Sequence, residues 1–330
     1  MYIYFHNKGT YYSSFKKFWV VENSYPIIEK LNVINTRRKA KGISTYDFST
    51  LYTTIPHNLL IKVLSEIIRF VFKSKVRSKI GFSAASIYWT SKGSGRRYFT
   101  EKTLIDAVTF LIKNCYFSVG NMVFRQDIGI PMGIDPAPFW ANLFLYFFES
   151  KHVQTLVSQR SNRAYKYHGT SRFIDDLCTI NDGNEFSRSF KCIYPKELVL
   201  KLEHSGTHAT FLDLDINIED GMFIYKLFDK RDKFPFFIVR MPHLQSNIPS
   251  SIFYGSIFSE FLRIARCTLK FQHFLPRASE LYQRMISQGA NGTSINRQIL
   301  KGFQRYPDIF KKYGKTYYEL IEDLQYFGIN

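Results

Sequence analysis

Two adjacent aspartates, Asp175 and Asp176, stand between two apolar, strand-forming runs in the segment RFIDDLCTIND. The β-prone residues on both sides predict a strand, a tight acidic turn and a second strand over residues 170–181. Neighbouring carboxylates repel each other, so keeping both ionised is costly unless a cation compensates. Their hard oxygen ligands suit magnesium. An acidic pair in a turn is also a common solvated or helix-capping feature, and that interpretation stays open.

Two further segments accompany this pair. YDFSTLYTTIPH places Asp47 at the end of a β-prone stretch, and RQDIGIPMGIDPAPFWANLF is a glycine-bracketed loop that opens a helix. Phosphoryl transfer with two metal ions requires carboxylates from two different strands, and Asp47 and Asp175 are candidates for that role. Each segment alone also has an ordinary interpretation, as a strand end or as a loop whose glycines serve turn geometry. Their occurrence together, in this order, favours a catalytic centre.

The composition narrows the choice of partner. Lys and Arg number 45 against 27 Asp and Glu, a net charge of +18, which favours a polyanionic ligand through counterion release. Ribosomal association, an anionic membrane or plain solubility fits the same charge. The four cysteines are widely spaced without a CxxC pair, so a reducing intracellular setting is expected rather than a zinc ribbon or a disulfide framework. The first residues lack the order of a signal peptide, and no apolar run approaches the ~18 residues of a membrane span.

Periodicity predicts the remaining elements. Apolar spacing indicates helices over residues 58–73, 103–115 and 137–156, and a basic helical region beyond Pro249. Alternation from Leu198 to Phe228 predicts antiparallel strands. A Gly-rich basic loop at residues 91–99 is either a phosphate contact or a solvated loop. Tight turns are expected at Gly120-Asn121, Ser205-Gly206 and Asp220-Gly221.

The order of DFSTLY, GIPMG with APFWANLF, FIDD and FLDLDI resembles motifs A, B, C and the D/E region of reverse transcriptases. The resemblance is closest to Penelope-like retroelements and their relatives near telomerase, and it covers roughly residues 44–305. FIDD is a close variant of the YxDD box of that family. The resemblance implies an α+β right-hand polymerase with an antiparallel-sheet palm, partial fingers and a helical thumb. The implied division is residual fingers at 1–45, the palm with a fingers insertion at 46–232 and the thumb at 233–330.

The resemblance also implies an active site. Asp47 and Asp175 would bind two magnesium ions, or manganese, with Asp176 beside them and the Phe48 carbonyl as a backbone ligand. Tyr52 takes the place of the aromatic steric gate that rejects a 2′ hydroxyl, although a core aromatic is the alternative interpretation. The residues implied to pack under the incoming nucleotide are Gln126, Gly129, Pro131, Met132 and Gly133.

The downstream region is expected to hold the nucleic acid. Asp213 and Asp215 in FLDLDI are predicted to be structural, because alternation puts both on the face opposite Leu212 and Leu214. SNIPSSIFYGSIFSEFLRIAR resembles the start of the family's thumb, and a solvated basic face is the alternative. The candidate contacts to primer–template phosphates are Arg263, Arg266, Lys270, Arg277 and Arg284.

The implied function is RNA-directed DNA synthesis, with an RNA template, a DNA primer and dNTPs as partners and the nucleus as the setting. Only 46 residues precede Asp47, and no GIY-YIG endonuclease follows, so an N-terminally truncated element is expected. A decayed or domesticated remnant that binds nucleic acid without catalysis is the main alternative. A metal-dependent nuclease using the same carboxylates is a third hypothesis.

Overall fold

The computed structural model describes residues 18–75, 78–84, 86–91, 97–236, 238 and 241–327. Most of the basic loop predicted at 91–99 and the start of the predicted fingers segment therefore lie outside the described residues. The chain divides into two compact units, which are described separately. The first holds the described residues up to Glu22 together with Ser44–Glu203, and the second holds Asn23–Ile43 and the chain from His204 onward. The predicted three-part division stays a prediction.

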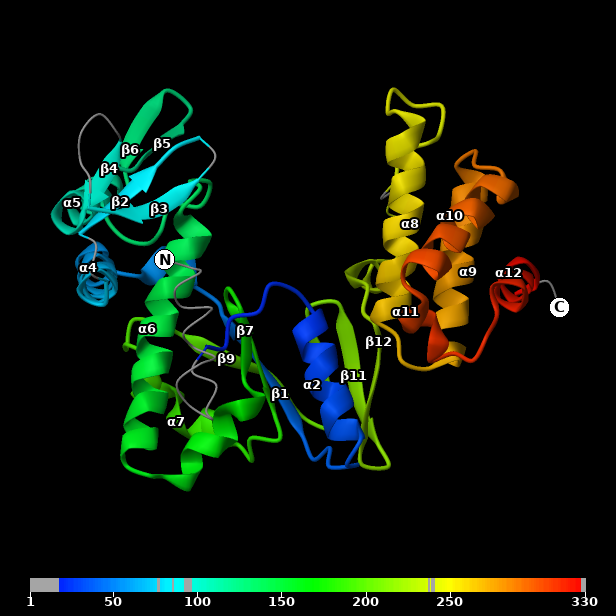
Figure 1. Cartoon of the computed structure of the whole chain (residues 1–330), viewed down its shortest axis with the longest axis horizontal. Coiled ribbons are helices and arrows are strands. Elements are labelled where there is room, and N and C mark those ends of the chain that lie inside the picture. The colour runs from blue at the N-terminus through cyan, green and yellow to red at the C-terminus, as the bar shows by residue number, and fades with distance from the viewer. Residues whose placement is uncertain are drawn as a thin grey trace. The chain divides into compact units, whose positions relative to one another are not determined.

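The first unit is built on a four-stranded sheet in the order β7-β8-β1-β9 (Figure 1). A three-stranded sheet, β3-β2-β4, and the hairpin β5-β6 are separate from it. The elements of this unit are β1 Ile43–Phe48, α3 Leu51–Thr54, α4 His57–Lys73, β2 Lys79–Phe82, β3 Ile87–Thr90, β4 Tyr98–Thr100, α5 Glu101–Lys113, β5 Tyr116–Val119, β6 Met122–Arg125, α6 Ala137–Ser158, the 3-10 helix η1 Asn162–Gly169, β7 Ser171–Phe173, β8 Asp176–Ile180, α7 Glu185–Ile193 and β9 Leu200–Gly206.

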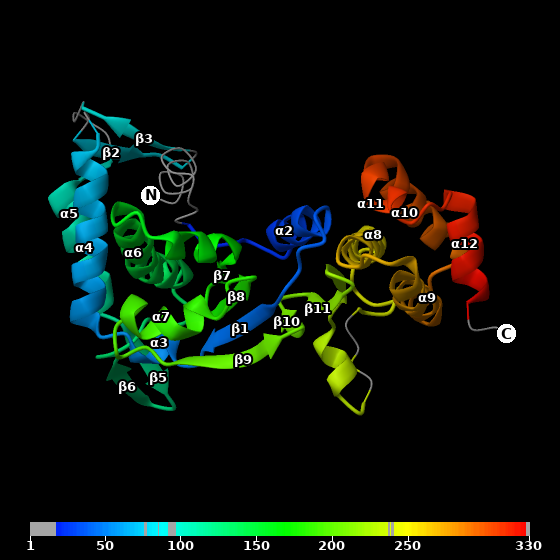
Figure 2. The ribbon, with the colours of Figure 1, turned by 90° about the horizontal axis from the view of Figure 1, so that it is seen from below.

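Helix α7 and the residue after it pack on β1 of this sheet through aromatic side chains. The ring of Tyr46 on β1 lies 4.9 Å from that of Phe186 on α7, and the ring of Phe48 lies 4.9 Å from that of Tyr194. Helix α4 contacts both α5 and α6, and Figure 2 shows α4 and α5 side by side. The resulting apolar core fixes the end of β1, where Asp47 lies.

Most predicted elements of this unit are confirmed. The apolar sequence pattern found α4, α5 and α6 to within a few residues. Helices α4 and α6 each bury many apolar side chains, whereas Ile112 is the one residue of α5 that is buried. The expected turn at Gly120 joins β5 to β6, with Gly120 at φ +59°. The predicted strand–turn–strand over 170–181 corresponds to β7 and β8.

The second unit combines a three-stranded antiparallel sheet, β10-β11-β12, with a group of helices. The helical region predicted beyond Pro249 is confirmed as α8 to α12. None of the helices in the described part of the chain is both long and apolar enough to span a bilayer. The elements of this unit are α2 Tyr25–Asn35, β10 His208–Phe211, β11 Leu214–Glu219, β12 Met222–Leu227, the 3-10 helix η2 Lys230–Lys233, α8 Ser250–Arg266, α9 Phe271–Ser287, α10 Gly292–Arg305, α11 Pro307–Lys311 and α12 Tyr317–Tyr326.

One predicted turn is wrong. The chain does not reverse at Ser205-Gly206, since β9 continues through Gly206 and pairs in a different sheet from β10. The reversal lies instead at Leu212-Asp213, between β10 and β11, where Leu212 adopts φ +54°. Asp213 is thus a turn residue rather than a strand residue. Alternation in FLDLDI concealed this turn because a positive φ at leucine has no sequence signature. The predicted turn at Asp220-Gly221 is confirmed between β11 and β12.

Asn35, the last residue of helix α2, bonds to the backbone at the edge of β12. The Asn35 Nδ2 donates to the Phe223 carbonyl at 2.8 Å, and the Phe223 N–H donates to Asn35 Oδ1 at 2.7 Å. The side-chain amide of Asn35 thus makes the two hydrogen bonds to Phe223 that a neighbouring strand would make to one residue of β12.

We expect Asn35→Ala to lower the free energy of unfolding by about 1–3 kcal/mol, because both Phe223 backbone groups lose their partner. Chemical denaturation of the parent and the variant measures this loss. Val33→Ala is the matched control, since Val33 lies on the same helix with 64% of its surface exposed and should change stability by less than about 0.5 kcal/mol. Equal losses in the two variants would contradict the assigned role of Asn35.

Candidate active site

The acidic turn of RFIDD is a two-residue hairpin loop. In the antiparallel pair of β7 and β8, Phe173 faces Asp176, so Ile174 and Asp175 form the loop. Ile174 has φ +53°, and positive φ at the first loop residue is the pattern of a type II′ turn. A β-branched residue rarely adopts this conformation, so the turn that carries Asp175 is strained.

Strand β1 lies beside β8 and brings Asp47 to this turn. The Phe48 N–H donates to the Asp175 carbonyl oxygen at an N···O distance of 3.1 Å, which makes the backbones of Asp47 and Asp175 neighbours. Burial raises the pKa of the Asp47 carboxyl above its ordinary value, and the negative charge of Asp175 raises it further. The two carboxylates predicted to act together are therefore close enough to repel each other.

These residues fit magnesium in part. Within the described ranges, no three His, Cys, Asp or Glu side chains gather as a metal-binding group. Protein-bound magnesium, however, often takes only one or two carboxylates and completes its shell with water and substrate phosphates. The paired oxygens of Asp47 and Asp175, whose charges repel, meet that requirement. Asp176 begins β8 next to them. The magnesium sites themselves stay a prediction.

The glycine loop predicted under the nucleotide is fixed to the segment that follows Asp47. The Ile130 N–H donates to the Tyr52 carbonyl at 2.7 Å, and the Gly129 N–H donates to the Ile55 carbonyl at 2.8 Å. The buried His57 holds the same loop, since its Nε2 lies 2.8 Å from the Gly129 carbonyl oxygen. Two predicted regions that are far apart in sequence thus form one backbone-bonded structure.

Gly129 is required by this close approach. Its φ is +89°, and a Cβ atom would lie 2.3 Å from the Tyr52 carbonyl oxygen. Tyr52 itself is half-buried on α3. Burial raises the pKa of its phenol, and the charge of Asp175 raises it further, so Tyr52 lies near the acidic turn.

The other predicted nucleotide-contacting residues are more exposed. Gln126 follows β6 and donates its Nε2 to the Ile128 carbonyl at 3.0 Å. Pro131 is half-buried, Met132 is 74% exposed, and Gly133 has φ +106° with open space around its Cα. The structure places these residues between β6 and α6, and their contact with a nucleotide stays a prediction.

Sequence reasoning missed the buried charges behind the turn. Arg172 on β7 and Glu149 on α6 form an ion pair, Nε to Oε1 2.6 Å, in which both side chains are fully buried. The Tyr194 hydroxyl donates to Glu149 at 2.9 Å, and the Arg172 Nη1 donates to the Ile174 carbonyl at 2.9 Å. The sequence offered two signals of this ion pair: a single acidic residue in the apolar run of α6, and an arginine beside FIDD.

The five predicted thumb cations all have partners inside the second unit. Arg263 pairs with Glu260 at 2.8 Å and with Asp213 at 2.9 Å, and Lys270 pairs with Glu219 at 2.5 Å. Asp213, which the sequence predicts to be structural, is one of these ion-pair partners.

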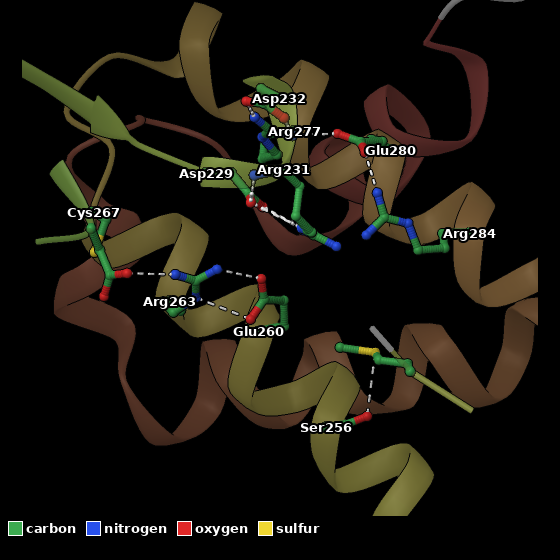
Figure 3. Close-up of polar contacts among 12 residues, drawn as sticks. Asp229, Arg231, Asp232, Ser256, Glu260, Arg263, Cys267, Arg277, Glu280 and Arg284 are labelled. Carbon is green, nitrogen blue, oxygen red and sulfur yellow. Dashed lines mark hydrogen bonds and ion pairs between the residues drawn. The ribbon is translucent and has the colours of Figure 1, made fainter. Parts of the chain in front are cut away.

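The remaining three thumb cations also have partners within the second unit. Arg277 and Arg284 share Glu280, and Arg277 also pairs with Asp232 (Figure 3). Arg266 donates to the Tyr25 hydroxyl at 3.1 Å and lies over that ring. Phosphate binding by this set of five stays a prediction.

A different basic face lies on α10. Arg297, Lys301 and Arg305 recur every four residues, so they share one exposed side of the helix opposite the buried Ile295 and Ile299. Among the described residues, no carboxylate lies within ion-pair distance of these three side chains. Sequence reasoning missed this face, although its four-residue spacing was visible.

Comparisons with known proteins bear on the fold. No family model matches the sequence, and no curated protein matches it. Solved telomerase structures do. Telomerase from Candida albicans in complex with a TWJ fragment of telomeric RNA matches with a TM-score of 0.51 at 12% identity, covering 93% of this chain and 55% of that chain. Telomerase from Candida tropicalis matches with a TM-score of 0.47 in the apo form, at 12% identity over 93% of this chain and 50% of that chain.

The chain spans about half the length of the telomerase chains that it matches. Its own antiparallel sheets and helices, together with the Candida albicans match, give a mixed α+β polymerase fold. The predicted fold class is confirmed. The likeness is one of fold alone, and the Penelope-like assignment stays a prediction.

The contact between Gly129 and Tyr52 predicts the effect of a single methyl group. We expect Gly133→Ala to cost about 1–2 kcal/mol of unfolding free energy through its backbone conformation alone. Gly129→Ala should cost more, because its Cβ would also force the loop away from the Tyr52 carbonyl. Denaturant unfolding of both variants measures the difference. Equal losses would show that the close approach at Gly129 is unimportant.

Proposed function

We propose that this chain is an RNA-directed DNA polymerase of a Penelope-like retroelement, which extends a DNA primer along an RNA template with dNTPs. The observation that supports it most is the backbone bond from Phe48 to Asp175, because it places Asp47, near the end of β1, beside Asp175 in the turn between β7 and β8. Two-metal nucleotidyl transfer needs that arrangement. The polymerase fold shared with telomerase supports the same proposal.

In this proposal Asp47 and Asp175 hold the magnesium ions, with Asp176 and the Phe48 carbonyl as neighbouring oxygen donors. Bound magnesium supplies charge stabilisation for the attacking 3′ hydroxyl and the departing pyrophosphate, and manganese would do the same. The residues of the chain position the reactants. Burial and the nearby charge of Asp175 raise the pKa of the Asp47 carboxyl.

Tyr52 and the glycine loop form the proposed nucleotide site. The ring of Tyr52 would lie against the sugar and exclude a 2′ hydroxyl, which selects deoxynucleotides. The backbone bonds of Gly129 and Ile130 to α3 and its flanking residues keep the loop beside that ring. Gln126, Pro131, Met132 and Gly133 complete the surface under the incoming base.

The proposed partners are an RNA template and a DNA primer, in a nuclear setting. The net charge of +18 favours a phosphate-rich ligand, and the Candida albicans telomerase was solved with an RNA fragment. Contacts to a template–primer duplex should be mainly to phosphate and sugar, because a template-reading enzyme must accept every sequence.

Primer extension on an RNA template with magnesium tests the catalytic claim. We expect Asp47→Asn and Asp175→Asn each to reduce nucleotide incorporation by at least about a hundredfold, since each removes an ionised metal ligand. Asp106→Asn is the matched control, because Asp106 is an exposed carboxylate on α5 away from the sheet, and it should behave as the parent.

The outcomes separate the hypotheses. Equal incorporation by the parent and the Asp175→Asn variant would refute the catalytic role of the turn. A parent that binds duplex without incorporation would identify a non-catalytic remnant. Degradation of labelled duplex without nucleotides, lost in Asp175→Asn, would identify a nuclease instead.

Duplex binding at increasing salt tests where the phosphates bind. We expect Lys301→Gln with Arg305→Gln to weaken binding and reduce the slope of log affinity against log salt by about 1–2, since each lost phosphate contact reduces it by about one. Arg277→Gln with Arg284→Gln removes the same formal charge from α9, where both side chains are already in ion pairs. It should reduce the slope less. The reverse order would assign the contacts to the α9 arginines and not to α10.

A further inference from the structure

Arg172 is a fully buried cation whose five N–H groups are all used. Nε and Nη2 donate to the two carboxylate oxygens of Glu149, at 2.6 Å and 3.2 Å. Nη1 donates to Asn142 Oδ1 at 2.8 Å and to the Ile174 carbonyl at 2.9 Å, and Nη2 also reaches the Asn142 carbonyl at 3.3 Å. One side chain therefore ties β7, α6 and the acidic turn together.

Burial of this pair is costly for the fold. Arg172 and Glu149 are both fully buried, and removing two charges from water is offset only where hydrogen bonding is complete. Apolar residues of similar volume would usually stabilise a core at least as well. What the charged pair provides, and an apolar pair does not, is a fixed orientation of every atom that the guanidinium contacts.

The contacted atom of greatest consequence is the Ile174 carbonyl. Ile174 is a β-branched residue at φ +53°, a conformation that persists only where surrounding contacts support it. The next residue is Asp175, whose own carbonyl accepts the Phe48 N–H. The orientation of the turn at Ile174 thus determines where the Asp175 carboxylate lies relative to Asp47.

We propose that Arg172 is a positioning residue that holds the strained Ile174-Asp175 turn, and with it the Asp175 carboxylate, against the end of β1. It acts through Ile174 and does not touch the reactants. Its anchor is α6, the helix that begins just after the glycine loop, so the same contacts keep the turn and the nucleotide site on one support. This inference rests on the proposed polymerase function.

The opposing possibility is that Arg172 only stabilises the core. Tyr194→Phe provides the comparison, because it removes the hydrogen bond to Glu149 but leaves the ring and every Arg172 donor in place. Arg172→Lys keeps the charge and loses the planar fork, including the contact with Ile174. Both variants weaken the same buried network, and only the second releases the turn.

Amide hydrogen exchange of Phe48, measured without substrate or metal, reports the turn directly. We expect Arg172→Lys to speed exchange at Phe48 at least about tenfold relative to the parent, because the Asp175 carbonyl moves away from it. Tyr194→Phe should leave that rate within about twofold.

The same preparations are then assayed by primer extension. We expect Arg172→Lys to lower kcat about 10–100-fold and to raise the magnesium concentration for half-maximal activity, with a smaller change in the KM for dNTP.

A rescue variant distinguishes positioning from general stability. Glycine accepts positive φ without strain, so Ile174→Gly added to Arg172→Lys should recover part of the lost kcat and slow the exchange at Phe48. A core defect would not recover in this way. Where Arg172→Lys fails to unfold cooperatively, Asn142→Ala provides the test instead, since it frees one side of the guanidinium and should act in the same direction.

The outcomes are decisive when the parent extends a primer. A folded Arg172→Lys variant with parental exchange at Phe48 and parental kcat overturns the inference, and so does an equal loss in Tyr194→Phe. An inactive parent instead counts against the polymerase proposal. If exchange at Phe48 still depended on Arg172 in an inactive parent, Arg172 would still be the residue that positions the turn.

Discussion

The hydrogen bond from the Phe48 N–H to the Asp175 carbonyl is the contact on which the candidate centre depends. It is a backbone contact, so it forms regardless of the charges on the side chains beside it. The pKa of the Asp47 carboxyl next to it is raised, first by burial and then by repulsion from the Asp175 charge. A side-chain contact would yield to that repulsion, whereas strand pairing backed by the aromatic core of Tyr46 and Phe48 resists it. The fold thus keeps in place a pair of like charges that would separate in an unfolded chain.

Residues with positive φ lie in the segments that present the site, and others lie elsewhere in the first unit, at Arg160, Asn181 and Asn184. Ile174 and Gly129 both have positive φ, and both stand where a backbone carbonyl or amide must meet another segment at close range. Each is held by groups that are themselves buried, Arg172 in one case and His57 in the other. Strained residues persist only where their surroundings determine them so completely. Gly129 adopts its positive φ without a steric cost because it has no side chain, whereas the positive φ of Ile174 is supported by the buried guanidinium of Arg172.

Most of the fold could be predicted from the sequence, since α4 and α6 each bury enough apolar residues to leave a clear apolar pattern. Asp47 and Asp175 were found by the family's motif order, and the structure places them together. The turn at Leu212 was missed because alternation continues through it while the backbone reverses. Arg172 was missed for a different reason. A buried ion pair depends on which segments meet in three dimensions, and a single sequence does not contain that information.

The same limit applies to the basic thumb helices. The sequence counts Arg277 and Arg284 as positive charge, but in the structure both are bound to Glu280, so much of their field is cancelled within a few ångströms. Counterion release depends on the phosphates that a surface neutralises, and a cation already paired with a carboxylate contributes little unless that pair opens. The exposed face of α10 has no such carboxylates among the described residues, so the charges of Arg297, Lys301 and Arg305 are not cancelled locally. Net charge therefore favours the proposed polyanionic partner, and the distribution of ion pairs makes α10 rather than α9 the expected contact.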